Sequence, residues 1–296
     1  MSRAGIVTVV GKPNVGKSTL LNRIIGQKLS ITSSKPQSTR DRIVGIRSEG
    51  DVQMVILDTP GLLEPRYELQ RAMRATALRA LDDADVIVYL VDAHERSAPP
   101  LVEAARLETA PRSPLIIAVN KIDTLEPALR EELSRRTAGD DSIALVSAAT
   151  GEGVELLLER IAALLPESHF LYPEDEIGTQ SLRFFAAELI RETALEQLEE
   201  EVPYSVACEI EEFREERRPV YIRAVIYVER PTQKQILIGR KGEQVREIGR
   251  AARIKIEELV GAPVYLDLWV KVLANWRRNA KALRRFGYKP PEDTTP

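Results

Sequence analysis

The sequence has few of the residues that form disulfides or bind transition metals. It contains one cysteine, Cys208, and two histidines, His94 and His169, among 296 residues. A single cysteine cannot form a disulfide within the chain, and these three residues are too few and too widely spaced for a zinc site. Cys208 lies among apolar residues of a predicted strand, which favours a packing role over a reactive thiol.

Long apolar runs are also missing. No segment approaches the roughly 20 residues that span a bilayer, and the first residues lack the pattern of a secretory signal peptide. We therefore expect a cytoplasmic protein. Hydrophobic residues make up 44% of the chain and charged residues 29%, as in ordinary globular proteins, and the length is sufficient for two domains.

The net charge of −3 conceals an uneven distribution of charged residues. Residues 1–170 are nearly balanced, with 21 basic and 23 acidic residues. Residues 171–216 contain 14 acidic and 3 basic residues, whereas residues 217–290 contain 18 basic and 6 acidic residues. A basic block of this size predicts an anionic partner for the last third of the chain.

A phosphate-binding pattern is present near the start of the chain. Residues 6–20, IVTVVGKPNVGKSTL, predict a buried strand, a loop with the spacing Gly-x-x-x-x-Gly-Lys-Ser, and a helix. Backbone N–H groups and the helix N-terminus then surround an anion, while Lys17 reaches the β- and γ-phosphates and Ser18 holds magnesium. We predict nucleotide contacts from Gly11, Asn14, Val15, Gly16, Lys17, Ser18 and Thr19.

Two further segments are candidates for binding magnesium and the γ-phosphate. The polar stretch 29–42, LSITSSKPQSTRDR, predicts a long functional loop. Its Thr39 is a candidate magnesium ligand and catalytic residue, although a threonine in a polar loop is usually only solvated. Asp58 ends a predicted buried strand and is the candidate magnesium-linked carboxylate, and the Gly61 amide is expected to meet the γ-phosphate.

The segment NKID, residues 120–123, predicts selectivity for guanine. The Asp123 carboxylate can accept from guanine N1–H and the 2-amino group together, whereas adenine would leave this charge unpaired. Asn120 is expected to tie neighbouring loops together, and the stem of Lys121 to lie over the base. The segment Ser147, Ala148 and Ala149 follows a further strand, and the Ala148 amide is expected to donate to guanine O6.

Predicted strands alternate with predicted helices in the first 170 residues, which indicates an α/β domain. Its sheet should be mainly parallel with helices on both faces, and all of the motifs fall at strand carboxyl ends, where such sheets bind ligands. We expect this domain at residues 1–170, a linker at 171–181, a smaller α+β domain at 182–290 and a tail at 291–296.

The motifs GxxxxGKS, DTPG, NKID and SAA, in this order, resemble those of the translation-factor-like GTPases. Where many small GTPases have a glutamine that orients the attacking water, this chain has Leu62, so we expect slow intrinsic hydrolysis. In related GTPases an asparagine at the position of Asn14 binds a potassium ion that assists catalysis. The resemblance therefore implies a catalytic role for Asn14 with K⁺, and the alternative is that Asn14 only caps the loop.

The order of elements after residue 181 predicts an RNA-binding domain. A helix with apolar positions at helical spacing, and with glutamates expected on a solvated face, precedes two strands, a helix, GRKG, a second helix, a third strand and a basic last helix, NWRRNAKALRRF. This order matches one form of the KH domain, whose Gly-x-x-Gly loop holds a nucleic-acid backbone. Its candidate RNA-binding residues are Gly239, Arg240, Lys241 and Gly242.

The segments GKPNVGKSTLLN, KPQSTR and LIGRKG at these positions resemble Era-type GTPases over nearly the whole chain. The resemblance implies a GTP/GDP switch that binds the small-subunit ribosomal RNA near its 3′ end, assists assembly of the 30S subunit and associates peripherally with the membrane. We expect a monomer. One departure is Ser38, where members of this family more often have threonine, and it leaves Thr39 the better candidate ligand.

Two alternatives stay open for the last third of the chain. A membrane-surface GTPase would use the last helix, whose apolar residues alternate with basic ones, to bind anionic lipid; these residues are Trp276, Arg277, Arg278, Lys281, Leu283, Arg284, Arg285 and Phe286. The other alternative is a protein partner, whose binding would depend less on salt than RNA binding does.

Overall fold

The computed structural model describes residues 1–33, 35–95 and 98–291, which form two compact units. The first unit comprises Met1–Thr32, Thr39–Pro65 and Met73–Thr179, and the second comprises Ser33–Ser38, Arg66–Ala72 and the chain from Gln180 onward. The two short segments from the first 170 residues thus group with the C-terminal unit. The predicted tail, apart from Pro291, lies outside the described residues.

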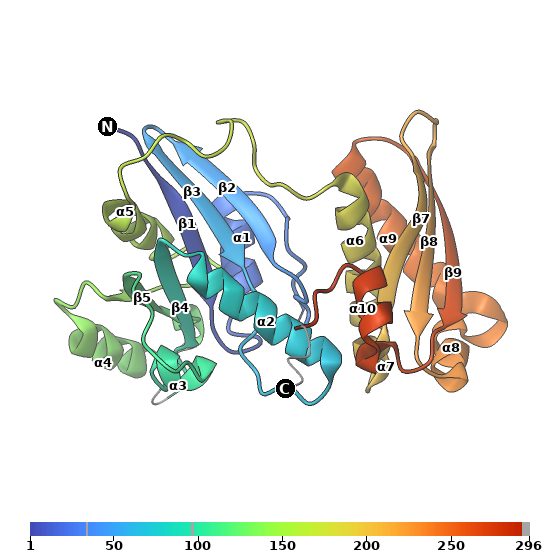
Figure 1. The fold of residues 1–296 in the computed structure, drawn as a ribbon, viewed down its shortest axis with the longest axis horizontal. Coiled ribbons are helices and arrows are strands. Elements are labelled where there is room, and N and C mark those ends of the chain that lie inside the picture. The colour runs from blue at the N-terminus through green and yellow to red at the C-terminus, as the bar shows by residue number, and fades with distance from the viewer. Residues whose placement is uncertain (34, 96–97, 292–296) are drawn as a thin grey trace. The chain divides into compact units, whose positions relative to one another are not determined.

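The first unit contains a six-stranded sheet in the order β2-β3-β1-β4-β5-β6 (Figure 1). Every neighbouring pair is parallel except β2 and β3. This confirms the predicted mainly parallel sheet. Its strands are β1 (Arg3–Val10), β2 (Ile43–Glu49), β3 (Val52–Asp58), β4 (Val86–Asp92), β5 (Leu115–Asn120) and β6 (Ile143–Leu145).

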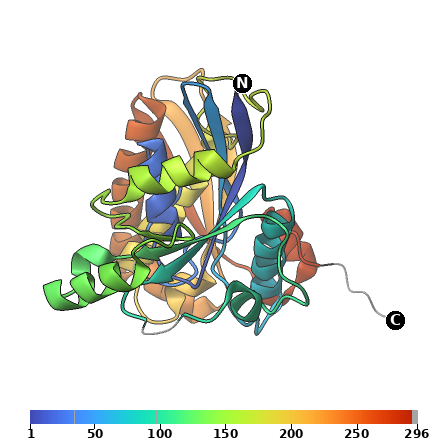
Figure 2. The ribbon, with the colours of Figure 1, turned by 90° about the vertical axis from the view of Figure 1, so that its left-hand side faces the viewer.

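Helices lie on both faces of this sheet, as predicted. The helices α1 (Lys17–Ile25) and α5 (Val154–Leu164) lie on one face, and α2 (Glu68–Asp82) and α3 (Leu101–Ala105) on the other (Figure 2). On the second face, buried Ala77, Leu81, Leu101 and Ala105 pack against Ile87 and neighbouring strand residues.

One helix of this unit was not predicted. The helix α4 (Pro127–Thr137) has the sequence PALREELSRRT and no buried residue, so hydrophobic periodicity gives little indication of it. A single 3-10 turn, η1 (Ile122–Thr124), precedes it.

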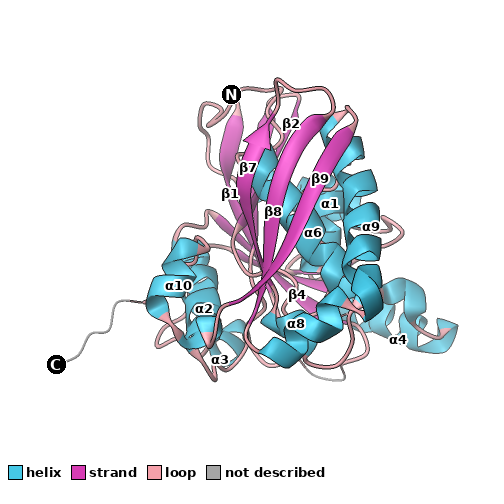
Figure 3. Cartoon of the chain, turned by 90° about the vertical axis from the view of Figure 1, so that its right-hand side faces the viewer, coloured by secondary structure: helices cyan, strands magenta, loops and turns pink. Residues whose placement is uncertain are grey.

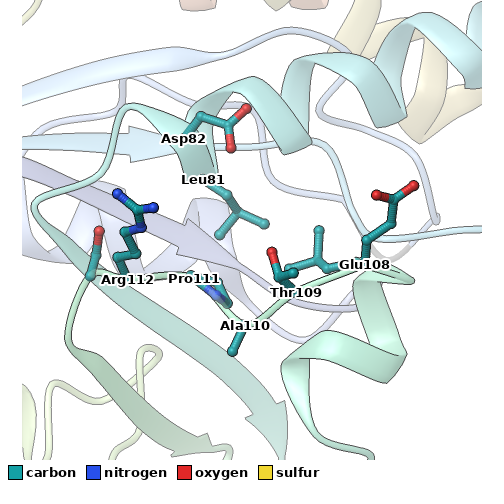
Figure 4. A pocket seen from close by; sticks show the side chains of 9 residues that line it. Leu81, Asp82, Glu108, Thr109, Ala110, Pro111 and Arg112 are labelled. Carbon is teal, nitrogen blue, oxygen red and sulfur yellow. The ribbon is translucent and has the colours of Figure 1, made fainter.

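The parallel register brings the motif residues to one edge of the sheet. Val9 of β1 pairs with Asp58 of β3, and Asp92 of β4 pairs with Asn120 of β5. Because parallel strands end at the same edge, the loops after β1, β3, β4 and β5 meet there. A pocket of about 340 Å³ lies elsewhere, between Leu81 and Asp82 of α2 and the segment 107–113 (Figure 4), and no predicted site residue lines it.

The second unit contains a three-stranded sheet in the order β7-β8-β9, with β7 antiparallel and β9 parallel to β8 (Figure 3). Buried residues of the helices α6 and α9 pack on one face of this sheet. The order of elements confirms the predicted α+β domain. It runs α6 (Leu182–Gln197), α7 (Val202–Ser205), β7 (Ala207–Arg214), β8 (Val220–Val228), α8 (Pro231–Ile238), η2 (Arg240–Gly242), α9 (Glu243–Val260), β9 (Val264–Val272), η3 (Trp276–Arg278) and α10 (Ala280–Arg285).

The prediction that the glutamates of α6 face solvent is wrong for Glu192. Its side chain has no exposed surface, because α6 packs against α9. Lys255 of α9 donates to Glu192 Oε2 at 3.0 Å and to Glu196 at 2.8 Å. The carboxylate of Glu192 is therefore buried as an ion pair with a cation from the facing helix.

The predicted continuous last helix is also wrong, because η3 and α10 are separate. Asn279 lies between them with φ −111°, and its side chain caps α10 by accepting from the amide of Ala282 at 3.0 Å. Trp276 is completely buried, and its indole N–H donates to the carbonyl of Ser205 at 2.8 Å. The tryptophan is thus part of the core of this unit.

Candidate functional site

The phosphate-loop motif forms a tight turn between β1 and α1. Gly16 has φ +102°, and a Cβ at this position would lie 2.3 Å from the Asn120 amide nitrogen, so only glycine fits there. The amide of Leu62 donates to the carbonyl of Gly11 at 2.9 Å, which places the segment after β3 directly against the loop. Val15 is buried in the loop, and Thr19 is half-buried in the first turn of α1.

Lys17 lies inside the loop rather than in solvent. Its ammonium group donates to the carbonyls of Lys12 at 2.8 Å and Gly11 at 3.2 Å. Burial lowers the pKa of Lys17 to about 8, against the opposing effect of the negative charge of Asp58. A buried cation that donates to neutral carbonyls is suited to bind phosphate, which brings further negative charge next to it.

The three predicted magnesium ligands lie together. Ser18 Oγ donates to Asp58 Oδ2 at 2.7 Å, Thr39 Oγ1 lies 3.4 Å from the same oxygen, and the two hydroxyls are 2.8 Å apart. Asp58 Oδ1 is buried and has no hydrogen-bond partner among residues 1–33, 35–95 and 98–291. Burial raises the pKa of Asp58, opposed by Lys17 and the hydroxyls. These oxygens fit a hard divalent cation.

A third hydroxyl beside Asp58 was missed. Ser30 Oγ donates to Asp58 Oδ2 at 2.7 Å, and Ser30 is only 2% exposed. No sequence pattern identifies Ser30, because serines are common in polar loops and the contact depends on how residues 29–32 fold back.

Asn120 ties two loops together, as predicted. Its Nδ2 donates to the carbonyl of Val15 at 2.7 Å, and its Oδ1 accepts from the amide of Ala148 at 2.9 Å. The Ala148 amide is therefore already engaged, and a bond to guanine O6 would compete with this contact. Asp123 is exposed at the same edge of the sheet. Ser147 is buried and accepts from the amide of Thr150 at 3.1 Å, whereas Ala149 is exposed.

Asp92, at the end of β4, holds Lys121 and was also missed. Lys121 Nζ lies 2.7 Å from Asp92 Oδ2, and the amide of His94 donates to Oδ1 at 3.0 Å. Partial burial raises the pKa of Asp92, but the hydrogen bonds from Lys121 and His94 outweigh it and hold the pKa at about 2. An aspartate at the end of a buried strand was the signal that identified Asp58, and the same signal applies to Asp92.

A hollow of about 420 Å³ adjoins the loop residues and extends to the loop after β6. It contains two of the predicted nucleotide contacts, Thr19 and Ala148. Its lining residues are Thr19, Asn22, Arg23, Gly26, Gln27, Lys28, Thr32 and Ala148. Arg23 donates to the carbonyls of Ala148 and Ala149, so α1 and this loop are joined beside the hollow.

The residues relevant to hydrolysis differ in exposure. Leu62 is 5% exposed and packs in the core beneath α2 and α3, so its side chain neither contacts water nor hydrogen-bonds. Asn14 is exposed at the outer turn of the phosphate loop, with φ +63°. Gly61 directly precedes Leu62 and therefore lies beside the loop.

The second unit contains the GRKG loop between α8 and α9. Gly239 has φ +71° and ψ 179°, and a Cβ there would lie 2.7 Å from the Gln244 side chain, so the tight turn requires glycine. Arg246 donates to the carbonyls of Lys241 at 2.5 Å and Gly242 at 3.2 Å. Arg240 and Lys241 are exposed, and their cationic side chains are accessible to an anion.

Comparison with protein families gives two matches. Residues 6–121 match the family described as 50S ribosome-binding GTPase, and residues 201–277 match the KH domain. The chain is 42% identical to the GTPase Era of Carboxydothermus hydrogenoformans, covering 97% of this chain and 98% of that protein. It is 45% identical to the GTPase Era of Pseudomonas aeruginosa, covering 97% and 95%.

Two solved structures have the same fold over the same length. One is Era in complex with MgGDPNP and nucleotides 1506–1542 of 16S ribosomal RNA, and the other is an Aquifex aeolicus Era variant bound to GDP and aluminium fluoride. Each has a TM-score of 0.89 and 40% identity, covering 97% of this chain and 99% of the other. With this likeness along nearly its whole length, the chain belongs to the Era family of GTPases and hydrolyses GTP.

Proposed function

We propose that this GTPase is a magnesium-dependent, guanine-selective switch that binds small-subunit ribosomal RNA through its GRKG loop. The observation that carries the nucleotide part is the convergence of the Ser18 and Thr39 hydroxyls on Asp58, whose second carboxylate oxygen has no partner among the described residues. The RNA part is supported by the exposed Arg240 and Lys241 in a Gly-x-x-Gly turn between two helices.

The residues of the first unit have separable roles in this proposal. Lys17 neutralises the β- and γ-phosphates, and Ser18, Thr39 and Asp58 hold Mg²⁺, which supplies positive charge to the developing phosphate oxygens. Asp123 accepts from the guanine edge, and Asn120 keeps the base-binding and phosphate loops together. Thr39 meets magnesium only with a γ-phosphate present, which makes its loop a sensor of the nucleotide state.

Nucleotide selectivity tests the first part. We expect GTP and GDP to displace a fluorescent guanine nucleotide at concentrations on the order of 10³-fold or more below those of ATP and ADP, because adenine leaves the Asp123 carboxylate unpaired. Similar affinities for ATP and GTP would contradict the proposal.

We also propose that Asn14 helps to bind a potassium ion, with part of the loop around residues 29–39 as the rest of its site. The support is indirect: Leu62 does not orient water, and Asn14 is exposed on the phosphate loop. Turnover of GTP in potassium chloride and in sodium chloride at equal ionic strength tests this. We expect faster hydrolysis in potassium for the unmodified protein and equal rates for Asn14→Ala, whereas equal rates for the unmodified protein reject potassium assistance.

The 16S rRNA fragment bound by the Era relative supports small-subunit ribosomal RNA near its 3′ end as the proposed ligand. The 30S subunit in the cytoplasm is the place of action that we propose. The double variant Arg240→Glu/Lys241→Glu should lower affinity for that RNA by about 10²-fold, because it replaces two phosphate-binding cations by anions. The matched control is Arg278→Glu/Lys281→Glu, which makes the same change in charge at exposed residues of η3 and α10. An equal loss in both variants would contradict the assignment to GRKG.

The same variants test the membrane-surface alternative, which the structure does not favour. Trp276 and Leu283, two of its three apolar residues, have no exposed surface. Among the described residues no helix is both long and apolar enough to cross a bilayer. If lipid binding were the main role, the Arg278→Glu/Lys281→Glu variant would lose binding to anionic vesicles while RNA binding stayed intact.

A further inference from the structure

We infer that Ser30, held in place by Asn22, is a positioning residue that fixes the orientation of the Asp58 carboxylate and so sets the magnesium affinity of the site. This inference rests on the proposed magnesium site at Ser18, Thr39 and Asp58. All of the residues concerned lie in the first compact unit.

Asn22 fixes the backbone at the start of the loop that follows α1. It lies one helical turn after Ser18 on α1. Its Oδ1 accepts from the amides of Leu29 at 2.9 Å and Ser30 at 2.8 Å, and its Nδ2 donates to the carbonyl of Ser30 at 2.7 Å. One side chain therefore binds peptide groups on both sides of the Ser30 α-carbon, which leaves this residue little freedom to rotate.

Ser30, fixed in this way, contacts the proposed magnesium site. Its hydroxyl donates to Asp58 Oδ2 at 2.7 Å, in a position that is 2% exposed. Both Asp58 and the base of Ser30 are fixed by protein groups: Asp58 ends β3, and Asn22 belongs to α1. The hydrogen bond consequently holds Oδ2 on the side of the hydroxyls and leaves Oδ1 without a partner in the part of the chain that the structure describes.

Ser30 differs from the other two hydroxyls around Asp58. The hydroxyls of Ser18 and Thr39 are 2.8 Å apart and are the proposed magnesium ligands. Ser30 is held by Asn22 rather than by nucleotide or metal, so it can keep donating to Asp58 in both nucleotide states. A carboxylate that is already oriented loses less freedom when a cation binds, which raises the affinity for that cation.

The test measures how magnesium slows release of a fluorescent GDP analogue, a reading independent of hydrolysis. Release is followed from EDTA to millimolar Mg²⁺ for the unmodified protein, Ser30→Ala, Asn22→Ala and the double variant. Loss of one hydrogen bond to a charged group predicts that Ser30→Ala needs about tenfold more magnesium for half-maximal slowing. Asn22→Ala and the double variant should shift by the same factor, because Asn22 acts through Ser30.

Ser113→Ala is the matched control. It removes a serine hydroxyl that donates to the carbonyl of Ala84 at 2.6 Å in the same unit, away from the nucleotide loops, and should leave the magnesium dependence unchanged. Release in EDTA should be equal for the unmodified protein and Ser30→Ala. If Asn22→Ala fails to fold, as judged by thermal unfolding, Ser30→Ala alone decides the question.

An unchanged magnesium dependence in Ser30→Ala, or additive shifts for the two single variants, would overturn the positioning role. If release from the unmodified protein does not respond to magnesium at all, the proposed magnesium site itself fails, and this outcome is distinct from failure of the Ser30 contact alone.

Discussion

Two buried charges of opposite sign, Lys17 and Asp58, lie at the carboxyl ends of β1 and β3. Lys17 and Asp58 are both enclosed, and burial shifts the pKa of each toward its neutral form while the other partner opposes that shift. The pocket is therefore polarised for a ligand with both phosphate and a divalent cation. Phosphate stabilises the charged ammonium and the cation stabilises the charged carboxylate.

The pKa of Lys17 predicts how nucleotide binding depends on pH. Since this pKa is about 8 without nucleotide, Lys17 loses its proton as pH rises through 8. Phosphate binds the charged form and raises the pKa again, so binding takes up a proton above that pH. The Kd for GDP should be flat below about pH 7 and rise above 8 by at most about tenfold per pH unit.

Fluorescence titrations with GDP between pH 6.5 and 9 measure this dependence. The variant Lys17→Ala should bind GDP more weakly. The pH dependence that remains in this variant comes from all other titrating groups, including guanine N1–H. The same slope in both proteins would show that Lys17 is not the titrating group.

Asp123 is the residue whose substitution should change the preferred base. Asp123→Asn replaces one accepting oxygen by an amide NH₂, which faces the 2-amino group of guanine but can donate to the 2-carbonyl of xanthine. Affinity for GTP should fall on the order of 10²-fold or more, and XTP should become the better ligand. Competition of GTP and XTP against a fluorescent nucleotide measures the change. Retained preference for GTP would show that Asp123 does not read the base.

At the scale of helices and strands, the elements that are predicted best are those with a clear pattern of apolar, buried residues. The apolar strands β1, β3, β4 and β5 and the glycine-bounded helix α1 follow from hydrophobic runs and loop residues. The helix α4 does not, because none of its residues is buried and it therefore has no apolar face to recognise. The prediction of a solvated face on α6 was wrong at Glu192. Periodicity identifies an apolar face, but it does not reveal that a lysine on another helix will pair with a buried carboxylate.

The contact between α6 and α9 gives a prediction about stability. Lys255→Met removes the cation that pairs with the fully buried Glu192 carboxylate, whereas Glu196, which is 45% exposed, can return to water. The free energy of unfolding of the second unit, measured in urea, should fall by about 3 kcal/mol. This is the cost of removing one partner of a buried ion pair.

Lys271→Met is the matched comparison for this prediction. Lys271 pairs with Glu211 at 2.8 Å, but both side chains are exposed, at 49% and 34%. Its loss should cost much less stability than the loss of Lys255, because water screens an exposed ion pair. Equal costs in the two variants would show that burial of Glu192 has no energetic consequence.

For the whole molecule, the identity of the ligands is easier to predict from the sequence than the path of the loops that contact them. Gly16, Lys17, Asp58 and Asn120 were identifiable because their motifs combine a residue type with a strand end. Ser30 and Asn22 were not, since their hydrogen bonds depend on the path of a loop with no regular pattern. The separation of a neutral first part from an acidic and then basic second part agrees with a nucleotide pocket and an anion-binding surface in one chain.

We propose that the guanine nucleotide bound to the first unit controls the affinity of the GRKG loop for RNA. The most direct measurement is the affinity of the protein for a fluorescent RNA of the 3′ end of 16S rRNA, with saturating GDPNP, with GDP and with the adenine analogue of GDPNP, at one fixed salt concentration. The RNA affinity with GDPNP should differ from that with GDP by about 5-fold or more, and the adenine nucleotide should have no effect. Equal affinity in all three conditions would contradict it.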